Sequence, residues 1–296
     1  MAPITAAADA HELHDACLRW YDRHARDLPW RRPEATPWHV MVSEFMLQQT
    51  PVNRVLPVYE AWVERWPTPG DLAGEPVGEA IRAWGRLGYP RRAMRLHACA
   101  NAIVDRHDGV IPDNRDALRA LPGVGEYTSA AIAAFAYGQR HAVLDTNVRR
   151  VFTRAVSGEE FPARSLTVAE RTLAERLLPD TPETAARWAV AVMELGALCC
   201  TAATPACSTC PLRARCEWRR RDYPRGERPR GQSYAGTDRQ CRGRLLGMLR
   251  DSAEPVSAAA LRTVWDDHAQ RERALDSLVA DGLVEPTGED HFRLPG

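Results

Sequence analysis

Two features of membrane and exported proteins are missing from this sequence. No run of about 18 apolar residues occurs, which a membrane-spanning helix would need. The N-terminal segment has no basic stretch ahead of an apolar core, so the pattern of a secretory signal peptide is missing too. We also find no internal repeat. These absences predict a cytoplasmic protein that does not associate with a membrane.

Net charge is also absent, because 39 basic residues balance 39 acidic ones. The overall charge therefore gives no reason to expect a nucleic acid as the partner. The basic residues are nevertheless clustered. Eight arginines between Arg213 and Arg230 face three acidic residues, and a second cluster comprises Arg86, Arg91, Arg92 and Arg95. Each cluster could follow a phosphate backbone, or be an ordinary solvated surface.

Runs of β-branched residues are scarce, whereas Ala and Leu are prominent and 45% of the residues are hydrophobic. Helical periodicity dominates residues 10–200, interrupted by proline and glycine turns. The pattern predicts the all-α class, with short helices packed together. One predicted helix, within residues 38–49, carries an apolar stripe with Glu44 at its flank, so Glu44 is expected to border a cleft. The stripe comprises Trp38, Met41, Val42, Phe45 and Met46.

The composition changes to Arg, Pro and Gly over residues 219–240, which predicts a linker. Beyond it, three helices are expected at residues 242–250, 257–265 and 268–280. Residues 283–285 and 291–294 then read as the strands of a small hairpin. We therefore predict a main domain over residues 1–218 and a winged-helix-like module over residues 241–296.

The segment Leu121-Pro-Gly-Val-Gly-Glu-Tyr-Thr-Ser-Ala-Ala-Ile132 predicts a tight turn between two helices. Asp113 or Asn114 could cap the first helix, Pro122 ends it, and Gly123 and Gly125 allow a turn with positive φ. Backbone N–H groups at the start of the next helix suit a DNA phosphate. A bare turn of this kind is more often structural than functional.

An apolar pair leads into Asp145, 20 residues after Gly125. By itself Asp145 reads as the N-cap of a helix that begins near Thr146. Together, the turn and Asp145 resemble the helix-hairpin-helix glycosylase superfamily. That resemblance implies DNA binding through Gly123 and Gly125, and an essential role for Asp145 beside the sugar of a flipped nucleotide.

Eight cysteines in a reducing compartment point to core thiols and metal ligands, because disulfides rarely persist there. Cys200, Cys207, Cys210 and Cys216 lie in one short segment, and their spacing alone leaves a zinc site open. The spacing resembles the endonuclease III-type [4Fe–4S] loop, which implies a cluster at residues 200–216. Cys199 is then a neighbour of the ligands, and Cys17, Cys99 and Cys241 are expected to be inert thiols.

Three further segments are Ser43-Glu-Phe-Met-Leu-Gln-Gln-Thr50, Leu28-Pro-Trp-Arg31 and Gly85-Arg-Leu-Gly-Tyr89. They resemble the MutY branch of the superfamily, the adenine-specific mismatch glycosylases, and the likeness covers about residues 15–220. It implies an endonuclease III-like helical fold of two subdomains. It also implies contacts with DNA or its bases for Arg31, Leu47, Gln48, Gln49 and Tyr89.

In this branch the residue at Glu44 is the general acid, and the resemblance implies that Asn147 hydrogen-bonds the acid pair. We expect a raised pKa for Glu44 in an apolar pocket and an ionised Asp145 near helix N-termini. Bifunctional relatives have Lys where this sequence has Tyr127, so no Schiff base can form there. The expected enzyme is a monomeric, monofunctional glycosylase acting on an adenine mispair in double-stranded DNA.

Two alternatives stay open from the sequence: a thymine or uracil mismatch glycosylase, and an iron–sulfur protein that binds DNA without catalysis. MutY-type enzymes usually continue into a Nudix-like domain that recognises 8-oxoguanine, and the residues after the linker are too few for it. Pro90 and Thr146 also differ from the residues common in the branch. Contact of Gln270, Arg271 and Arg273 with DNA is a further hypothesis.

Overall fold

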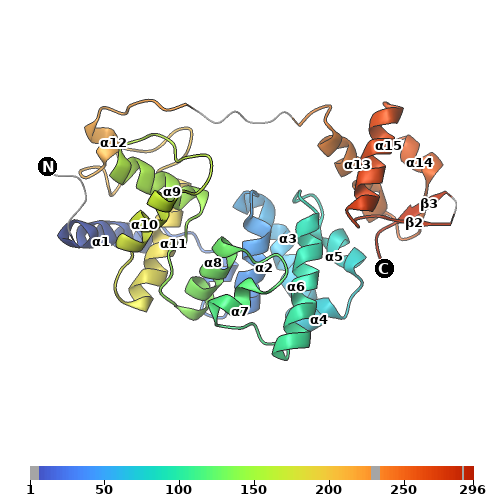
Figure 1. Ribbon diagram of the computed structural model, residues 1–296, viewed down its shortest axis with the longest axis horizontal. Coiled ribbons are helices and arrows are strands. Elements are labelled where there is room, and N and C mark those ends of the chain that lie inside the picture. Colours follow the sequence, from blue (N-terminus) through green and yellow to red (C-terminus); the bar gives the residue numbers. More distant parts are fainter. Residues whose placement is uncertain (1–6, 228–233, 289) are drawn as a thin grey trace. The chain divides into compact units, whose positions relative to one another are not determined.

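The computed structural model describes residues 7–227, 234–288 and 290–296, and these residues are predominantly helical, as predicted (Figure 1). The chain forms two compact units, each built from separate segments. Unit 1 holds the described residues of Met1–Pro37, Asp113–Asp116 and Gly125–Arg230. Unit 2 holds those of Trp38–Pro112, Ala117–Val124 and Gly231–Gly296. No helix in the described residues is long and apolar enough to cross a membrane.

Unit 1 is built around an apolar core that includes Trp20, Phe152, Trp188 and Leu195. Thr167 and Glu170 form a capping box at the start of α10, which fixes where that helix begins. Its helices are α1 (Ala7–His24), η1 (Pro29–Arg31), α8 (Glu126–Tyr137), α9 (Thr146–Phe152), the π-helical turn η2 (Thr153–Ser157), α10 (Val168–Arg176), α11 (Pro182–Leu198) and α12 (Glu217–Arg220).

Unit 2 has a second core, in which the rings of Trp62, Trp66 and Trp84 meet edge to face. Its helices before the linker are α2 (Pro37–Leu47), α3 (Val52–Arg65), α4 (Pro69–Ala73), α5 (Val77–Trp84) and α6 (Arg91–His107). Helix α7 (Arg115–Arg119) begins in a segment of unit 1 and ends in unit 2, and Asn114 accepts a hydrogen bond from Asp116 N at 2.9 Å as its cap. This confirms one of the two caps expected there.

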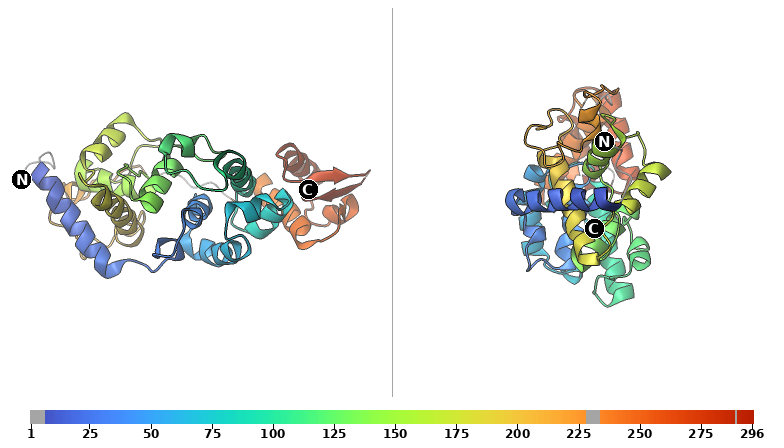
Figure 2. Two further views of the ribbon diagram at one scale, coloured as in Figure 1. Left: turned by 90° about the horizontal axis from the view of Figure 1, so that it is seen from below. Right: turned by 90° about the vertical axis from the view of Figure 1, so that its left-hand side faces the viewer.

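The C-terminal residues of unit 2 form three helices and a small antiparallel sheet (Figures 1 and 2). The three predicted helices and the hairpin are present, although the second helix ends at Arg262 and not at residue 265. The two-residue strand β1 was missed because it is too short to show a period. The elements are α13 (Asp238–Asp251), β1 (Val256–Ser257), α14 (Ala258–Arg262), α15 (His268–Ala280), β2 (Glu285–Thr287) and β3 (His291–Arg293), and the strand order is β1-β3-β2. Residues 228–233 of the predicted linker and Glu289 of the hairpin turn lie outside the described residues.

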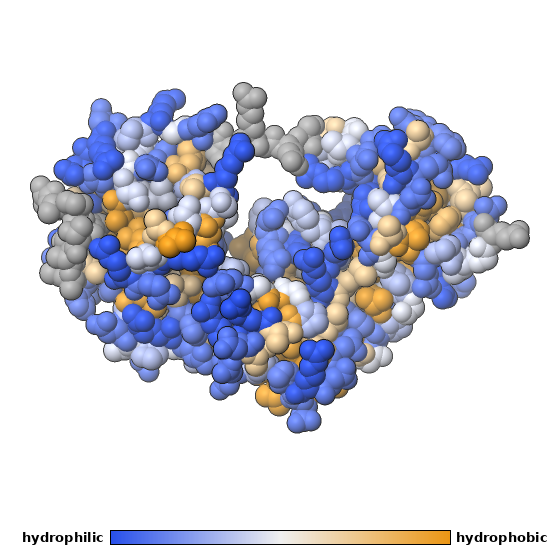
Figure 3. Space-filling model, in the orientation of Figure 1, coloured by the Kyte–Doolittle hydropathy of each residue, from blue (hydrophilic) through white to orange (hydrophobic). Residues whose placement is uncertain are grey.

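The face of the molecule shown in Figure 3 is mainly hydrophilic, and hydrophobic residues form small separate patches on it. The exposed large aliphatic side chains of the described residues, Val104, Val110, Val168 and Leu198, are correspondingly scattered along the chain. Scattered residues of this kind need no special explanation.

Candidate functional site

Asp145 is the N-cap of α9, as the sequence predicts. One carboxylate oxygen accepts a hydrogen bond from Val148 N at 2.7 Å, and the other accepts one from Asn147 Nδ2 at 2.7 Å. Burial is the largest influence on the pKa of Asp145 and raises it, while both hydrogen bonds and the charge of Arg150 lower it. The helix N-terminus therefore offsets only part of the cost of burying this charge.

A buried arginine holds the Asn147 amide in place beside Asp145. Arg150 Nη2 donates to Asn147 Oδ1 at 2.7 Å and to Gly196 O at 2.7 Å, and Arg150 Nε donates to Cys200 O at 2.7 Å. Gly196 lies so close to Asn147 that an added Cβ would stand 2.7 Å from the Asn147 Cβ. The candidate catalytic carboxylate is thus connected through two side chains to the first residue of the cysteine segment.

The predicted turn between α7 and α8 is confirmed, but only one of its two glycines has a positive φ. Gly123 has φ 79°, and a Cβ there would lie 2.9 Å from the ring of Phe45 and from Arg95 Cβ. Gly125 has φ −90° and is the N-cap of α8, so the expectation of a positive φ there was wrong. A Cβ on Gly125 would meet nothing within 4 Å, so the start of α8 stays open to a ligand.

Tyr127 lies in the first turn of α8, where its half-buried ring packs against the cluster that contains Ala130 and Ala131. Glu44 lies on α2 and is only 5% exposed. The expectation that α2 has one buried stripe was too narrow, because Val40, Ser43 and Glu44 are buried as well as the apolar stripe. Glu44 therefore places a carboxyl group in the buried interior of unit 2. Acidic residues are rarely buried in proteins, and those that are buried are often functional.

Gln48, Gln49 and Tyr89 lie on two loops of unit 2. Leu47 and Gln48 are half-buried at the end of α2, whereas Gln49 and Tyr89 are exposed. Gln49 has φ 56° and Tyr89 has φ 48°, a left-handed conformation that costs free energy for residues other than glycine. Surrounding structure must therefore hold both loops.

Arg92 supplies that support, although in the sequence it stands out only as part of a basic cluster. Its Nη1 donates to the carbonyl oxygens of Phe45 and Met46, each at 3.0 Å, and also to that of Gln48. Its Nη2 donates to Thr50 Oγ1 at 2.9 Å and to Gly88 O at 3.1 Å. Burial lowers the pKa of Arg92 to about 10. One guanidinium thus joins the end of α2 to the loop of Tyr89.

Arg31 is half-buried in unit 1 and forms an ion pair with Glu194, Nη1 to Oε2 at 2.9 Å. Glu194 is fully buried on α11, and Arg26 binds it through two further bonds of 2.6 and 2.8 Å. The arginines lower the pKa of Glu194, although burial is the largest influence and raises it. Glu194 and Arg26 were not predicted from the sequence. The only sign of this ion pair in the sequence is a single Glu within an apolar helix.

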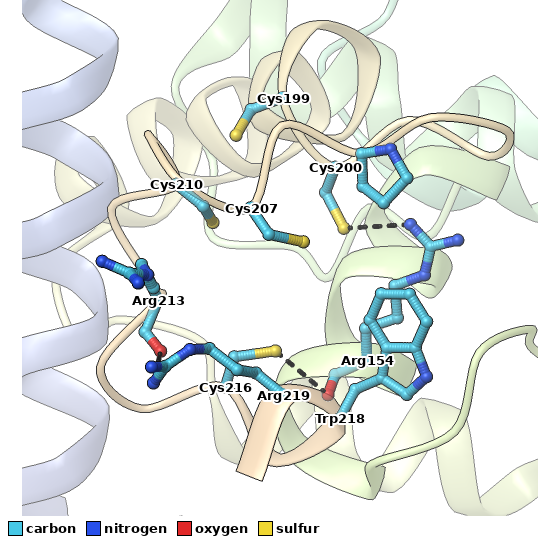
Figure 4. A pocket seen from close by; sticks show the side chains of 10 residues that line it. Arg154, Cys199, Cys200, Cys207, Cys210, Arg213, Cys216, Trp218 and Arg219 are labelled. Atoms are coloured by element: carbon cyan, nitrogen blue, oxygen red, sulfur yellow. Dashed lines mark hydrogen bonds between the residues drawn. The ribbon is translucent and has the colours of Figure 1, made fainter. Parts of the chain in front are cut away.

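The four predicted ligands Cys200, Cys207, Cys210 and Cys216 line one cavity of unit 1 (Figure 4). Their sulfur atoms surround a common space. Cys199 also lines the cavity, and its Sγ donates to Ala206 O at 3.4 Å. Among the described residues, no three His, Cys, Asp or Glu side chains converge closely enough to hold one metal ion. Four cysteine sulfurs around one space are a donor set that suits either a zinc ion or an iron–sulfur cluster.

The buried Arg154, on η2, lies at the edge of the cavity (Figure 4). Its Nη1 is 3.5 Å from Cys200 Sγ and donates to Thr201 O at 2.7 Å, and its guanidinium carbon lies 4.7 Å from the ring centre of Trp218. Burial raises the pKa of Cys200, while Arg154 lowers it. A fixed positive charge beside thiolates suits an anionic centre.

The family model described as "HhH-GPD superfamily base excision DNA repair protein" matches residues 42–176. An adenine DNA glycosylase of Mycolicibacterium smegmatis is 54% identical over 282 residues, covering 94% of this chain and 94% of that protein. The chain belongs to the HhH-GPD superfamily. A thymine/uracil-DNA glycosylase of Pyrobaculum aerophilum is 35% identical, covering 71% of this chain and 92% of that protein.

Membership in the HhH-GPD superfamily agrees with the fold. A solved structure of a non-covalent endonuclease III–DNA complex resembles the chain with a TM-score of 0.62 and 22% identity, covering 74% of this chain and all of that chain. The endonuclease III-like fold expected from the sequence is therefore confirmed. Unit 1 provides Asp145, Asn147, Tyr127, Gly125, Arg31 and the cysteines of this HhH-GPD protein, and unit 2 provides Glu44, Leu47, Gln48, Gln49, Tyr89 and Gly123.

Proposed function

We propose that this chain is an adenine DNA glycosylase that hydrolyses the N-glycosidic bond of adenine mispaired with 8-oxoguanine or guanine. The observation that carries the proposal is the 54% identity with the Mycolicibacterium smegmatis adenine DNA glycosylase along 94% of the chain. Its substrate would be double-stranded DNA, bound by a monomer in the cytosol. The main domain would be residues 1–218, with the linker and the C-terminal module after it.

The two carboxyl groups would have different roles in the reaction. Breaking the bond to the sugar builds positive charge there, which the Asp145 carboxylate would stabilise. Asn147 orients that carboxylate through the 2.7 Å hydrogen bond to Oδ2. Glu44, buried at 5% exposure, would protonate the adenine ring so that the base can leave. The base would be flipped out of the duplex before either group can act on it.

The opposite strand would be read by the loops of unit 2. Gln49 and Tyr89 are exposed in left-handed conformations, which suits side chains that enter the base stack when a base is extruded. Gln48 follows the last residue of α2 and would contact the base opposite the adenine. Extrusion costs a few kcal/mol, and insertion of these side chains would offset part of it.

The enzyme would be monofunctional, without strand cleavage. Schiff-base chemistry needs a primary amine, and the sequence has no lysine: its 39 basic residues are all arginines. Tyr127 stands at the start of α8, where its phenol cannot form a Schiff base. Borohydride should therefore trap no covalent DNA adduct through a side chain of this protein.

Cys200, Cys207, Cys210 and Cys216 would hold a [4Fe–4S] cluster, since their sulfurs surround one cavity. When bound, the cluster would supply a rigid cross-link of residues 200–216 rather than a catalytic group. Arg154 balances charge at the cavity, and Arg213 and Arg219 line it as well. Arg213 and Arg215 could also meet DNA phosphates.

The decisive experiment is single-turnover base release from four duplexes, containing 8-oxoguanine:A, G:A, G:T and G:U. We expect release of adenine from the first two and no release of thymine or uracil. Activity confined to G:T and G:U would instead support the second candidate, a thymine/uracil glycosylase like the Pyrobaculum aerophilum protein that is 35% identical to this chain. Binding without release from any duplex would support a protein that binds DNA without catalysis.

A further inference from the structure

The C-terminal module, residues 237–296, is docked on α5 of unit 2. Gly78 N donates to Pro295 O at 2.8 Å, and Arg250 Nε donates to Ile81 O at 2.9 Å. Arg82 Nη1 donates to Ser252 O at 2.9 Å and also to Arg250 O. These bonds follow α5 from its first turn to its last.

The module also contacts the first turn of α6. Arg91 Nη1 lies 3.3 Å from Asp281 Oδ1, and Asp281 is held in turn by Arg242 at 2.6 Å. Gly282 packs against Met94, since an added Cβ would lie 3.3 Å from the end of that side chain. Helices α5 and α6 flank the loop of residues 85–90, so the module contacts the helix on each side of the loop that carries Tyr89.

The contact is too close to be a loose association. A Cβ on Gly78 would lie 2.4 Å from Pro295 O and 3.0 Å from Leu294 Cβ, so a glycine is required there by the approach of the chain end. Burial at the same contact lowers the pKa of Arg250 to about 10. Arg250 is half-buried, and its hydrogen bond to a backbone carbonyl of α5 compensates for the solvent that its guanidinium loses.

The surface of the module is poorly suited to DNA. Residues 237–296 contain eleven acidic residues and eight arginines, so the module is net negative. The buried Arg271 donates to Trp265 O at 2.7 Å, and Gln270 bonds Trp265 Nε1 at 2.7 Å and Asp238 at 2.9 Å. Gln270 and Arg271, two of the three residues on α15 proposed from the sequence to contact DNA, therefore bond within the module itself.

We propose that the C-terminal module is an intramolecular brace that holds the Tyr89 loop and so sharpens recognition of the base opposite the adenine, without touching DNA. The inference rests on the proposed function of that loop. The module holds α5 and α6, the helices on either side of the Tyr89 loop, and Arg92 joins that loop to the end of α2. Arg92 also lies 5.4 Å from the ring centre of Tyr89, which joins the two supports.

The test uses the full chain with Gly78→Ala, which introduces the clash with Pro295 O while raising the intrinsic helix stability of α5. The matched control is Gly247→Ala on α13, because a Cβ there meets nothing within 4 Å. Arg82→Ala is a second variant at the other end of the contact. Hydrogen exchange should quicken at residues 78–82, 250–252 and 85–90 in the two test variants and not in the control.

Single-turnover rates should then show a ratio of 8-oxoguanine:A to G:A release that is about tenfold lower in the test variants. Affinity for a fully paired duplex should change by less than about twofold, with the same salt dependence. An unchanged ratio, or unchanged exchange at residues 85–90 after the module is released, would overturn the brace. A loss of paired-duplex affinity on Arg273→Glu would overturn it too, because it would show direct contact with phosphate.

Base release and hydrogen exchange distinguish a failure of the proposed function from a failure of the brace. If wild type releases no adenine from either duplex, the glycosylase assignment falls. The exchange experiment still decides on the brace in that case, because it measures the loop and not the reaction.

Discussion

Arg150 in unit 1 and Arg92 in unit 2 are both buried arginines that bond backbone carbonyl oxygens, but they hold different kinds of structure. Arg150 fixes a side chain, since its Nη2 bonds the Asn147 amide that in turn bonds Asp145. Arg92 fixes backbone, since it bonds Phe45 O, Met46 O and Gly88 O around two exposed loops. Arginine suits both tasks because its planar group offers five donors.

The difference separates two parts of the proposed reaction. Loss of a group that orients Asp145 should lower the rate of bond cleavage, because the carboxylate acts on charge that develops in the transition state. Loss of a group that holds Gln49 and Tyr89 should instead weaken the choice of duplex. Substitutions in each unit test whether unit 1 sets the rate of bond cleavage and unit 2 sets the choice of duplex.

The largest effect is expected from Asp145→Asn. Base release from 8-oxoguanine:A should fall by about a thousandfold or more, since the charge that stabilises the sugar is lost. Duplex affinity should stay within about threefold of wild type. Retention of more than a tenth of the wild-type rate would contradict the catalytic assignment.

The same variant makes a prediction about stability and pH. Burial raises the pKa of Asp145 in the folded protein, so ionisation costs stability as the pH rises through that pKa. Asparagine avoids this cost and can still cap α9. The Tm of Asp145→Asn should equal or exceed that of wild type at pH 7, and the difference should shrink below about pH 4, the ordinary range for Asp. Thermal unfolding at several pH values measures this.

Arg150→Met should lower the rate of base release by about a hundredfold, with little change in duplex affinity. It leaves the Asn147 amide without its support and removes the bond to Cys200 O. The matched control is the neighbouring Arg149→Met, because the Arg149 side chain bonds Glu170 at 2.8 Å, Ala163 O and Ser165 O, while its backbone bond to Asp145 O is kept in the variant. Equal effects of the two variants on the rate would show that Arg150 acts only through general stability.

Arg92→Met should have the opposite pattern, with affinity for the mispaired duplex lower by about tenfold and discrimination between 8-oxoguanine:A and G:A reduced. The loops of Gln49 and Tyr89 lose the group that joins them. Arg92→Lys should recover part of the loss, because an ammonium can bond some of the same carbonyls. Arg106→Met, at the exposed end of α6, is the control and should behave as wild type. A wild-type ratio of 8-oxoguanine:A to G:A release in Arg92→Met would show that Arg92 and Arg150 do not differ in the way proposed.

The smallest effect is expected from Cys199→Ser. Iron content should stay near the wild-type value, since Cys199 stands beside the four predicted ligands without being one of them. Cys207→Ser should lose most of the iron, measured colorimetrically with the absorption spectrum. Iron loss in Cys199→Ser equal to that in Cys207→Ser would mean that the ligand set is wrong.

The sequence predicted the elements whose causes are local. The cap of α9 by Asp145, the cap of α7 by Asn114 and the turn at Gly123 depend on residues a few positions apart, so they could be foreseen. The turn itself was foreseen for a partly wrong reason, since Gly125 does not need a positive φ. The hairpin of the C-terminal module was expected for the same local reasons, while the short strand β1 was not.

The chain sequence by itself determined the helical class, the cysteine segment, the place of Glu44 on a helix and that of Asp145 at a helix N-terminus. Periodicity, spacing and capping depend on residues that are near one another in the sequence. Only the tertiary structure decided which residues support them. Glu194 meets Arg26 across 168 positions of sequence, Arg150 meets Cys200 across 50, and Arg92 meets Phe45 across 47. A buried charge must be paired or hydrogen-bonded, and its partners are the carbonyl or carboxylate groups that the folded chain brings beside it. The local sequence pattern does not identify those partners.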